Sequence, residues 1–506
     1  MKRTKILALL ATAAFFSSFA TAQDMDFGDD FGSDFGGDFG DSSSSSSFAA
    51  TALSVNGEAQ VNFRAYVDDE GTSGLPIDEW NTWVDPKGKL GLNYSNDSVS
   101  ADVKFALSKD IITDYKADII DELTLEAYLG NFVIQAGKMK VVWGKGDKLH
   151  VIDNFNANDY KDFLIPDYID RRISETMVRV LYNAPNDAGP FTSNRFEFVW
   201  TPFMTADRYA ASGRWVPNQV NELKESLTRT AGKLITKQRM LAGTDSEAQT
   251  VYTTMLSRSS SLADNLYPDL YQLKYMQAGA RFTTTTGSWD WGVSYYFGRD
   301  KRASFDYENI VHGTYVEKYL KGTAGEDDKF IDYDFLQVFG VEAAKTFGAY
   351  NFRAEAAYNL TQDVAGDNPR IHNNSVAWVF GFDRDLPISE LNFNLQTQGK
   401  YIINHDEIDD SKNSIDTEKS TYKTDNKLVL NISDNLAHGK LKPEVSAIYG
   451  FEHFDLIIMP KVTWYVSDGL EFSASGMYMQ SFIESRSEFG NWHNNSFVQI
   501  AAKYTF

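Results

Sequence analysis

From residue 57 to the end of the chain, the sequence repeatedly alternates apolar and polar residues with a period of two. This is the spacing of a β-strand that has one apolar face and one polar face. The clearest segments are 59–67, 99–107, 289–297 and 352–360, and further ones are 123–129, 196–200, 376–382, 391–395 and 470–474. A chain built from such segments is predicted to be all-β, with one face of each strand away from water.

The links between these segments decide between a soluble sandwich and a barrel, because both folds alternate. Short links occur at 96–98, 130–131, 286–288, 347–349, 387–389 and 467–469. The links between them are mostly longer and more acidic, for example 68–88, 299–333 and 404–423. Short periplasmic turns and long outer loops are typical of outer-membrane barrels. We therefore predict a transmembrane antiparallel β-barrel of about 18 strands, with 16 as the alternative because bacterial single-chain barrels have even counts.

Residues 1–22 have the three parts of a secretory signal peptide. Lys2, Arg3 and Lys5 form the positive end, residues 6–16 are the apolar run, and residues 20–22 are a small-residue cleavage site. That run is too short to cross a membrane as a helix, and no later apolar run is longer. The chain has no cysteine, which excludes disulfides, thiolate chemistry and a lipid-anchored N-terminal cysteine.

Residues 23–53 are of low complexity, with a recurring Asp-Phe-Gly followed by a run of serines. Such a segment has too little apolar surface to offset the entropy of ordering, so we predict a disordered periplasmic tail before a barrel of residues 54–506. Removing the three basic residues of the signal changes the net charge from −22 to −25. A chain this acidic is not expected to bind nucleic acid.

The alternation stops in residues 137–173, which follow the fifth predicted strand and are therefore the third outer loop. Gly144 and Gly146 allow sharp bends, and Pro166 cannot donate to a strand ladder. The apolar residues of this segment need burial, for example Val142, Trp143, Leu149, Phe155, Phe163 and Ile165. We therefore predict that the loop folds into the barrel mouth. Its candidate constriction residues are Lys138, Lys140, Lys145, Asp147, Lys148, Asp153, Asp159, Arg171 and Arg172. Because acids and bases nearly balance, no strong anion preference is expected.

A second long loop, 202–272, carries a helical pattern in place of alternation. Its apolar residues recur at helical spacing, at Val220, Leu223, Leu227, Leu234 and Ile235. Thr244 and Glu247 have the spacing of a capping box for a second helix. We expect a partly helical fourth outer loop that covers the rim, with a lid, a plug or a partner surface as alternatives.

The polar faces of the predicted strands carry charges of both signs. The candidate lumen-facing residues are Arg64, Asp102, Lys104, Glu126, Arg179, Arg195, Arg281, Asp290, Arg353 and Glu355. Taken singly, each is a solvated residue that keeps a channel wet. Taken together, opposed charges set a transverse field that selects ions and orients dipolar solutes.

Motifs of catalysis or metal binding do not emerge from the sequence. The seven histidines include no pair at i, i+4, and no H-E-x-x-H or G-x-S-x-G motif occurs. Gly144-Lys145 resembles the end of a phosphate-binding loop, but Met139 stands at the required glycine and Gly146 at the required Ser/Thr. The acidic group at 405–410 is a solvated loop on the simplest interpretation. No catalytic residue, metal or cofactor is predicted.

The last segment, 496–506, alternates and ends on Phe506, with Tyr504 on the same face. An alternating final strand with a C-terminal aromatic resembles the assembly signal of bacterial outer-membrane barrels. With the signal peptide and the strand pattern, residues 57–506 resemble the porin class. The stretch 137–172, with Trp143-Gly144-Lys145 and the run from Asp153-Asn154 to Asp159-Tyr160, is similar to a segment of several poorly characterised porin-like families.

The resemblance to porins implies a bacterial outer-membrane location, contact with outer-membrane lipids, and recognition of Tyr504 and Phe506 by the barrel assembly machinery. The resemblance itself brings no substrate with it. From the barrel and its third outer loop we predict passive diffusion of small hydrophilic solutes through a channel narrowed by that loop, with no enzymatic activity. One alternative is a closed barrel that serves as a surface adhesin or structural protein. A transporter of hydrophobic compounds is a third interpretation, which the polar lumen face disfavours. A monomer and a homotrimer both remain open.

Overall fold

The structure is a computed structural model. It describes residues 52–67, 82–108, 119–147, 149–166, 168–210, 213–243, 245–262, 265–305, 313–325, 328–368, 370–407, 422–489, 492 and 495–506. The predicted signal peptide and nearly all of the predicted tail lie outside the described residues. The first strand begins at Ala52, two residues before the predicted start of the barrel at residue 54.

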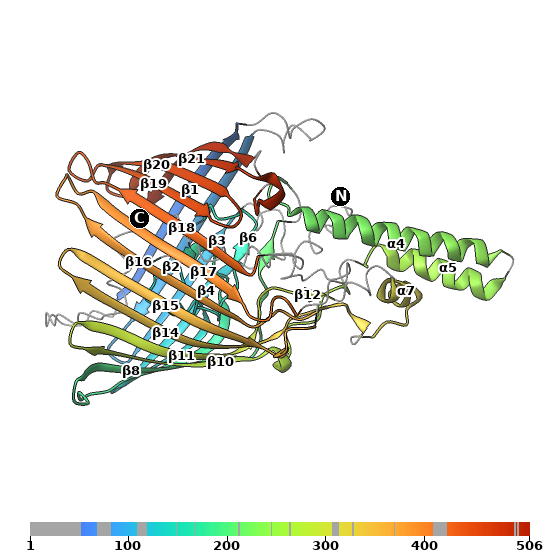
Figure 1. The fold of residues 1–506 in the computed structure, drawn as a ribbon, viewed down its shortest axis with the longest axis horizontal. Helices are drawn as coiled ribbons and strands as arrows, with labels where there is room; N and C mark the ends of the chain where they lie inside the picture. The colour runs from blue at the N-terminus through green and yellow to red at the C-terminus, as the bar shows by residue number, and fades with distance from the viewer. Residues whose placement is uncertain are drawn as a thin grey trace.

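Eighteen strands form one antiparallel sheet that closes on itself (Figure 1). They are β1 (Ala52–Tyr66), β2 (Thr82–Ser95), β3 (Val99–Leu107), β4 (Ile120–Leu129), β5 (Phe132–Met139), β7 (Glu175–Asn183), β8 (Phe191–Thr201), β10 (Gln277–Thr286), β11 (Trp289–Arg299), β14 (Phe335–Phe347), β15 (Tyr350–Thr361), β16 (Ser375–Asp385), β17 (Asn392–Ile402), β18 (Thr424–Ser433), β19 (Leu441–Gly450), β20 (Asp455–Ser467), β21 (Leu470–Ser481) and β22 (Phe497–Thr505). Each strand pairs with the next, so the predicted 18-strand antiparallel barrel is confirmed.

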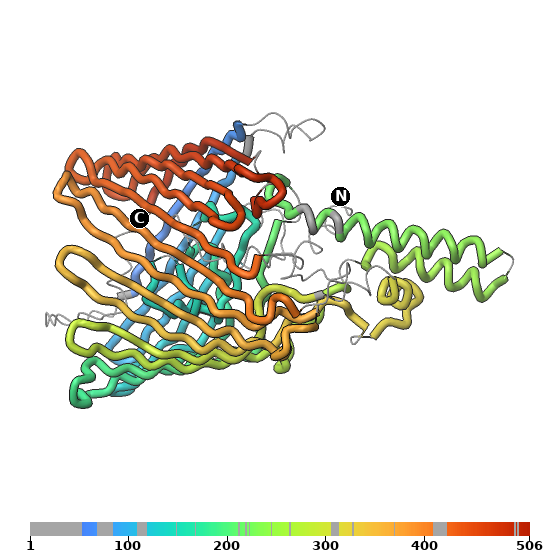
Figure 2. Tube along the Cα trace, viewed as in Figure 1, coloured from blue at the N-terminus to red at the C-terminus, as the bar shows by residue number. Residues whose placement is uncertain are grey.

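The first and last strands of the chain meet at the seam of the barrel (Figure 2). Strands β1 and β22 pair from Glu58 opposite Thr505 to Tyr66 opposite Phe497. Just beyond this ladder, the backbones of Gly57 and Phe506 exchange two N–H···O hydrogen bonds of 2.9 Å. A Cβ at Gly57 would lie 2.6 Å from Cζ of Phe506, so the C-terminal ring packs against a position that only glycine fits. The last residue therefore helps to close the barrel.

The strand faces differ sharply in chemistry. On β1, Val61 and Phe63 are 50% and 43% exposed, while Asn62 and Arg64 are 4% and 1% exposed. The same contrast recurs around the barrel, where large apolar side chains lie exposed on the outer face, including Leu125, Phe198, Val293, Val341, Phe380 and Ile500. An apolar outer face and a polar inner face are the arrangement that a bilayer requires. Among the described helices, none combines the length and the hydropathy that a membrane crossing requires.

The links at one end of the barrel are mostly long, and this end is called the long-loop end. It carries the third loop (140–174), the fourth loop (202–276), the fifth loop (300–334) and the ninth loop (482–496). The prediction of strict alternation between short and long links is too simple. The link 451–454 at the long-loop end is shorter than the turn 184–190 at the opposite end. A tight hairpin is compatible with either end, because hairpin length depends on turn type.

The fourth and fifth loops together form a small helical outgrowth. It contains α4 (Asn218–Ala242), α5 (Ser246–Ser259), η4 (Leu273–Tyr275), α7 (Thr314–Lys321), β12 (Ser304–Phe305) and β13 (Ile331–Asp332). Figure 1 shows α4 and α5 projecting beyond the barrel end. The expected helical face is present, because Val220, Leu223 and Leu227 are buried. The expected cap is wrong: Asp245 caps α5 by accepting from the N–H groups of Glu247 and Ala248, and Thr244 lies outside the described residues.

Candidate functional site: the third loop inside the barrel

The third loop is a folded segment with its own short elements and two apolar anchors. It contains β6 (Asp159–Tyr160) and α3 (Tyr168–Arg171), and β6 pairs with β9 (Arg208–Tyr209) of the fourth loop. Of the six apolar residues for which burial was predicted, four are buried, namely Trp143, Leu149, Phe155 and Phe163, while Val142 and Ile165 are half-buried. Trp143 and Phe155 pack with inner-face residues of β7, β8, β11 and β14–β16. Leu149 and Phe163 pack with residues of β16 and β18–β22. The loop therefore contacts both sides of the barrel interior.

A glycine turn of the third loop wraps around the carboxylate of Glu355 on β15. Oε1 accepts the backbone N–H of Gly146 at 2.6 Å, and Oε2 accepts that of Val151 at 2.9 Å. His150 Nδ1 lies 2.9 Å from Oε1. At Gly144 the φ angle is +129°, and a Cβ there would meet Oε1 of Glu355 at 2.1 Å. The glycines are required by this close approach as well as by the bend.

A row of ion pairs fixes the loop to the wall formed by β7, β8, β10 and β14. The indole Nε1 of Trp143 donates to Glu197 Oε1 on β8 at 2.9 Å. The same carboxylate oxygen accepts from Nε of Arg179 at 2.7 Å, and Oε2 lies 3.8 Å from Nη1 of Arg281. Arg281 also donates twice to Glu342, at 2.8 and 2.9 Å. Arg179 and Arg281 were predicted on the lumen face by alternation alone, and the strand register brings them together with Glu197 and Glu342.

Three further contacts tie the loop to other strands. Arg64 of β1 donates to both oxygens of Asp162, at 2.6 and 3.0 Å. Asn394 of β17 donates to Asp147 Oδ2 at 2.6 Å, and Nη1 of Arg353 lies 3.8 Å from the same oxygen. A third pair joins Lys89 of β2 to Asp170 of α3 at 2.7 Å. Burial alone would raise the pKa of Asp170, but the Lys89 ammonium outweighs it and the pKa is lowered.

The predicted constriction residues are mostly paired. The ammonium of Lys138 donates to the backbone carbonyl of Ile120. Nζ of Lys140 lies 3.2 Å from Oδ2 of Asp121, and Nζ of Lys161 lies 3.6 Å from Oδ2 of Asp159. Arg172 and Asp153 form a buried pair at 2.7 Å, and Lys145 is half-buried. Lys148 lies outside the described residues.

Arg171 differs from the other predicted constriction residues. It is 1% exposed, and none of its three guanidinium nitrogens finds a hydrogen-bond partner in the described part of the chain. A buried cation without an acidic partner is costly unless water or an anion reaches it. Arg171 is therefore a fully buried constriction residue whose charge has no carboxylate partner among the described residues.

The remaining predicted lumen residues all lie on the polar strand face. Asp102 stands opposite Asn93, and Lys104 contacts Glu122 at 3.3 Å. Glu126 accepts a hydrogen bond from the side chain of Gln135, and Asp290 accepts one of 2.5 Å from the hydroxyl of Thr285. Arg353 forms an ion pair with Asp383. Arg195 is half-buried and stands opposite Thr283. These contacts are lateral, between neighbouring strands, as expected for paired charges on an inner wall.

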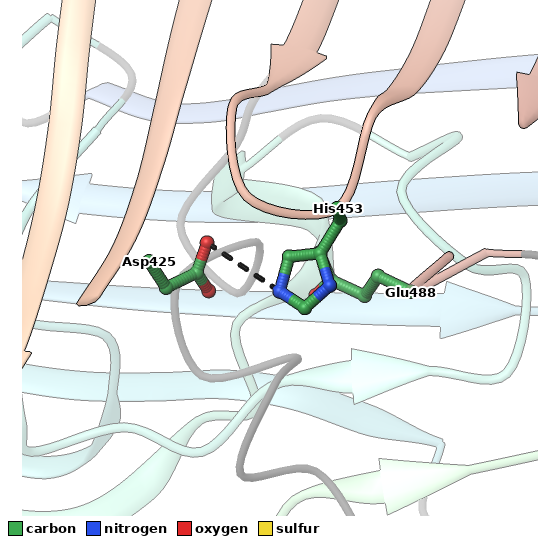
Figure 3. A group of neighbouring side chains, drawn as sticks. All are labelled: Asp425, His453 and Glu488. Carbon is green, nitrogen blue, oxygen red and sulfur yellow. Dashed lines mark ion pairs between the residues drawn. The ribbon is translucent and has the colours of Figure 1, made fainter. Parts of the chain in front are cut away.

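A cluster that sequence reasoning missed joins Asp425 of β18, His453 of the link 451–454 and Glu488 of the ninth loop (Figure 3). One ligand atom from each lies within 4.8 Å of the others, which is the geometry of a cation site. However, Nζ of the buried Lys427 lies 3.0 Å from oxygens of both carboxylates. Burial and the nearby Asp425 carboxylate raise the pKa of Glu488 to about 8, although Lys427 opposes the shift. The ammonium supplies the positive charge here, so the cluster is an internal ion-pair group.

Comparisons with known proteins identify no family for this chain. No family model matches the sequence, and no curated protein matches it. Solved structures that resemble it include a mutant of the Rhodopseudomonas blastica porin, at 10% identity and a TM-score of 0.36, covering 90% of this chain and 100% of that one. A loop deletion mutant of OmpT, an outer-membrane protein of Vibrio cholerae, is 9% identical with a TM-score of 0.37 and the same coverage. We base no functional assignment on these likenesses.

The closed ladder and the strand faces define the class on their own. Eighteen antiparallel strands leave no sheet edge, and their outward side chains form an apolar surface around a polar interior. In hydrocarbon every backbone polar group must be paired, which a closed barrel achieves. The chain is a membrane-spanning β-barrel with a folded loop in its interior.

Proposed function

We propose that this protein is an outer-membrane channel for small hydrophilic solutes, with the third loop as its constriction. The observation that supports the proposal most directly is the anchoring of that loop to the inner wall on several sides. Glu355 holds one turn of it, Arg64 holds Asp162, and Glu197 holds Trp143. A loop fixed in this way narrows the lumen while polar side chains remain along the rest of the wall. The polar wall does not suit a hydrophobic cargo.

The charges along the proposed path argue for weak ion selectivity. Most cations of the third loop and of the wall are paired with carboxylates, so their fields largely cancel. Arg171 is fully buried with no carboxylate partner among the described residues, and it gives the constriction a modest preference for anions. We therefore expect a channel that passes both ions, with chloride slightly favoured.

The proposed location and assembly rest on the chain ends. The last strand completes the barrel by pairing with β1, and Phe506 extends that ladder to Gly57. We infer that Phe506 and Tyr504 are recognised by the barrel assembly machinery, and that the predicted signal and tail place the N-terminus in the periplasm. No catalytic step forms part of the proposal.

A closed barrel is the second candidate function, and one observation favours it. The apolar clusters around the third loop include residues of strands on opposite sides of the interior. The loop therefore packs across the interior like a hydrophobic core, in addition to its polar contacts with the wall. In that case the helical outgrowth, which projects beyond the barrel (Figure 1), would be the functional surface, as in an adhesin or a structural protein.

Conductance separates the two candidates. Purified protein is added to a planar lipid bilayer in potassium chloride, and the current is recorded at fixed voltage. A channel gives discrete, ohmic current steps, whereas a closed barrel inserts without them. Insertion is checked independently by protection of the barrel from protease in vesicles. Protected protein that never conducts would refute the channel and leave the closed barrel.

A further inference from the structure

Arg299 is the last residue of β11 and lies on the outer face of that strand. By the two-residue period it shares this face with Val293 and Tyr295, which are both exposed. Its cross-strand neighbour on β14 is the exposed Phe335, and the guanidinium carbon lies 3.5 Å from the centroid of that ring. A cation therefore ends an apolar, membrane-facing surface at the long-loop end of the barrel.

The position of Arg299 along β11 fits the boundary of the bilayer. At the other end of the strand, Nζ of Lys345 lies 4.5 Å from the ring centroid of Trp289, so a cation–aromatic pair marks each end. Trp289 is the first and Arg299 the last of the 11 residues of β11. This is about 34 Å along the strand, or about 25 Å across the membrane at a tilt of roughly 35–45°. The apolar band of a barrel has about this height, so Arg299 lies level with the lipid headgroups.

A second cation lies beside Arg299. Nη2 of Arg299 donates to the backbone carbonyl of Lys274 at 3.5 Å, and Nζ of Lys274 lies 4.9 Å from the ring centroid of Tyr275. The guanidinium carbon of Arg299 lies 5.2 Å from the centroid of the same ring. Leu273 and Met276, which flank Lys274 and Tyr275 in the sequence, are exposed. The two cations and the exposed apolar side chains next to them are called the rim patch, which consists of Leu273, Lys274, Met276, Arg299 and Phe335.

Neither cation of the rim patch forms an ion pair with a carboxylate in the described part of the chain. Arg299 donates at 2.7 Å to the backbone carbonyl of Tyr333, which is a neutral acceptor. The carboxylate of the adjacent Asp332 accepts instead from the hydroxyl of Tyr275 at 3.3 Å. The positive charge of the patch is therefore available to an anion at the membrane boundary.

Lys423 provides a contrast at the same end of the barrel. Its Nζ lies 5.5 Å from the ring centroid of Tyr401, an exposed residue near the end of β17. The same Nζ lies 3.3 Å from Oδ2 of Asp406. Here a cation over an aromatic ring already has a carboxylate of the protein as its partner, so it has less to gain from another anion.

We propose that the rim patch binds the phosphate of an anionic membrane lipid, whose acyl chains lie along the outer face of β11 and β14. Guanidinium and ammonium groups donate charge-assisted hydrogen bonds to phosphate oxygens. The apolar face below Arg299 gives the acyl chains a surface, which a free phosphate ion would not use. The inference goes beyond the proposed function, because it requires the membrane-spanning barrel but no open channel.

Native mass spectrometry of the full chain in detergent tests the site. The protein is mixed with equal amounts of phosphatidylglycerol and phosphatidylcholine that carry the same acyl chains, so the two probes differ only in headgroup. Phosphatidylglycerol has a net negative charge, whereas the choline group neutralises the phosphate of the other lipid. We expect phosphatidylglycerol adducts to exceed phosphatidylcholine adducts by about fivefold or more. Equal adducts of the two lipids overturn the proposal.

Two single variants locate the binding. Arg299→Gln and Lys274→Gln should each lower the ratio of phosphatidylglycerol to phosphatidylcholine adducts about fivefold, the contribution of one cation near an anionic membrane surface. Lys423→Gln is the matched control, because it removes a cation at the same end of the barrel that already pairs with Asp406. The control should keep the ratio of the parent. A ratio that falls equally in all three variants overturns the assignment to this patch.

Folding of each variant is checked by circular dichroism. If Arg299→Gln fails to fold, Lys274→Gln decides, because the exposed Lys274 side chain makes no hydrogen bond among the described residues. An unchanged ratio in folded Lys274→Gln and Arg299→Gln contradicts the proposal.

Two further outcomes of the same measurement would identify another occupant. Loss of the phosphatidylglycerol adducts on addition of millimolar inorganic phosphate would assign the patch to free phosphate. Dimers or trimers that carry no lipid would place a second copy of the chain on this surface. Either result overturns the lipid assignment.

Discussion

His150 Nδ1 lies 2.9 Å from Oε1 of Glu355, although the two residues belong to the third loop and to the barrel wall. The carboxylate is fully buried and also accepts two backbone N–H groups of the loop. A buried carboxylate needs several donors to offset its lost hydration, and here the loop provides them. The conformation of the loop and the burial of Glu355 therefore depend on each other.

Replacing Glu355 should release the third loop. We expect Glu355→Leu to raise single-channel conductance, because Gly146, His150 and Val151 lose their shared acceptor. The unmade hydrogen bonds should cost about 2–4 kcal/mol in free energy of unfolding, measured by urea titration. Glu126→Leu is the control, since Glu126 accepts from Gln135 of the neighbouring strand and should leave conductance unchanged. Equal conductance in both variants would place the constriction elsewhere.

Gly144 should tolerate no side chain. Gly144→Ala faces a positive φ and a Cβ that would lie 2.1 Å from Oε1 of Glu355 and 2.5 Å from Nδ1 of His150. Gly130→Ala separates the two effects, because Gly130 has a φ of +63° with nothing within 4 Å of its Cβ. The control should lose about 1–2 kcal/mol from backbone strain alone. Gly144→Ala should lose more, and its third loop should be cleaved faster by protease. Equal losses of stability in Gly144→Ala and Gly130→Ala would mean that the loop shifts to accommodate the added methyl group.

Arg171 should set the ion preference of the channel. Arg171→Met removes a buried charge that has no acidic partner in the described part of the chain, so the reversal potential in a salt gradient should shift toward cation preference. The double variant Asp153→Asn/Arg172→Met removes a matched pair in the same loop and should leave the reversal potential nearly unchanged. The free energy of unfolding is a second readout, since Arg171→Met removes an unpaired buried charge and should leave this free energy unchanged or raise it. A larger shift in the double variant would show that Arg171 lies off the permeation path.

Removing Phe506 should impair closure of the barrel. Its backbone makes two hydrogen bonds to Gly57, and its ring packs where Gly57 has no side chain. We expect the shortened chain to reach the periplasm but to accumulate there or be degraded, as measured by fractionation. Phe482→Ala is a control, because it truncates an exposed aromatic residue away from the β1–β22 seam. Normal membrane levels of the shortened chain would show that the seam forms without this residue.

The alternation of apolar and polar residues predicted the barrel well. The two-residue period of a strand assigns each side chain to one of the two faces, whichever strands lie beside it. Arg179, Arg281 and Glu355 were placed on the polar face from sequence alone, and all three lie there. The strands at 175–182, 427–432 and 456–465 are also present, as β7, β18 and β20. The apolar residues of 137–173 predicted a buried loop, since an exposed set of that size would be unfavourable.

The contact partners of these side chains could not be predicted from the sequence, because they depend on strand register and on contacts between distant segments. Asp425, His453 and Glu488 come from a strand and two different loops, and nothing in their spacing indicates that they meet. The same holds for Asn154 and Gln398, which line one cavity from opposite parts of the chain. The cap of α5 was misassigned by one residue, since Thr244 and Asp245 are adjacent residues that both favour caps.

Stability of the ninth loop should fall as pH rises, because Glu488 has a raised pKa. Burial raises the pKa of Glu488 to about 8 in the folded protein, against 4.5 for the ordinary group, with Asp425 adding to the shift and Lys427 opposing it. A carboxyl that binds its proton more tightly when folded stabilises the fold at low pH. That contribution is lost progressively between about pH 4.5 and pH 8. Protease cleavage within 482–496 should therefore accelerate over this range.

Glu488→Gln should abolish the pH effect while keeping the buried shape, and cleavage should then be nearly constant from pH 5 to pH 8. Glu484→Gln is the matched control, because Glu484 lies exposed in the same loop and should leave the parent profile intact. The unfolding temperature of the whole barrel gives a second readout, which should fall with pH in the parent and not in Glu488→Gln. A parent loop whose cleavage rate stays constant from pH 5 to pH 8 would mean that Glu488 is already ionised beside Lys427 over this range and that its pKa is not raised.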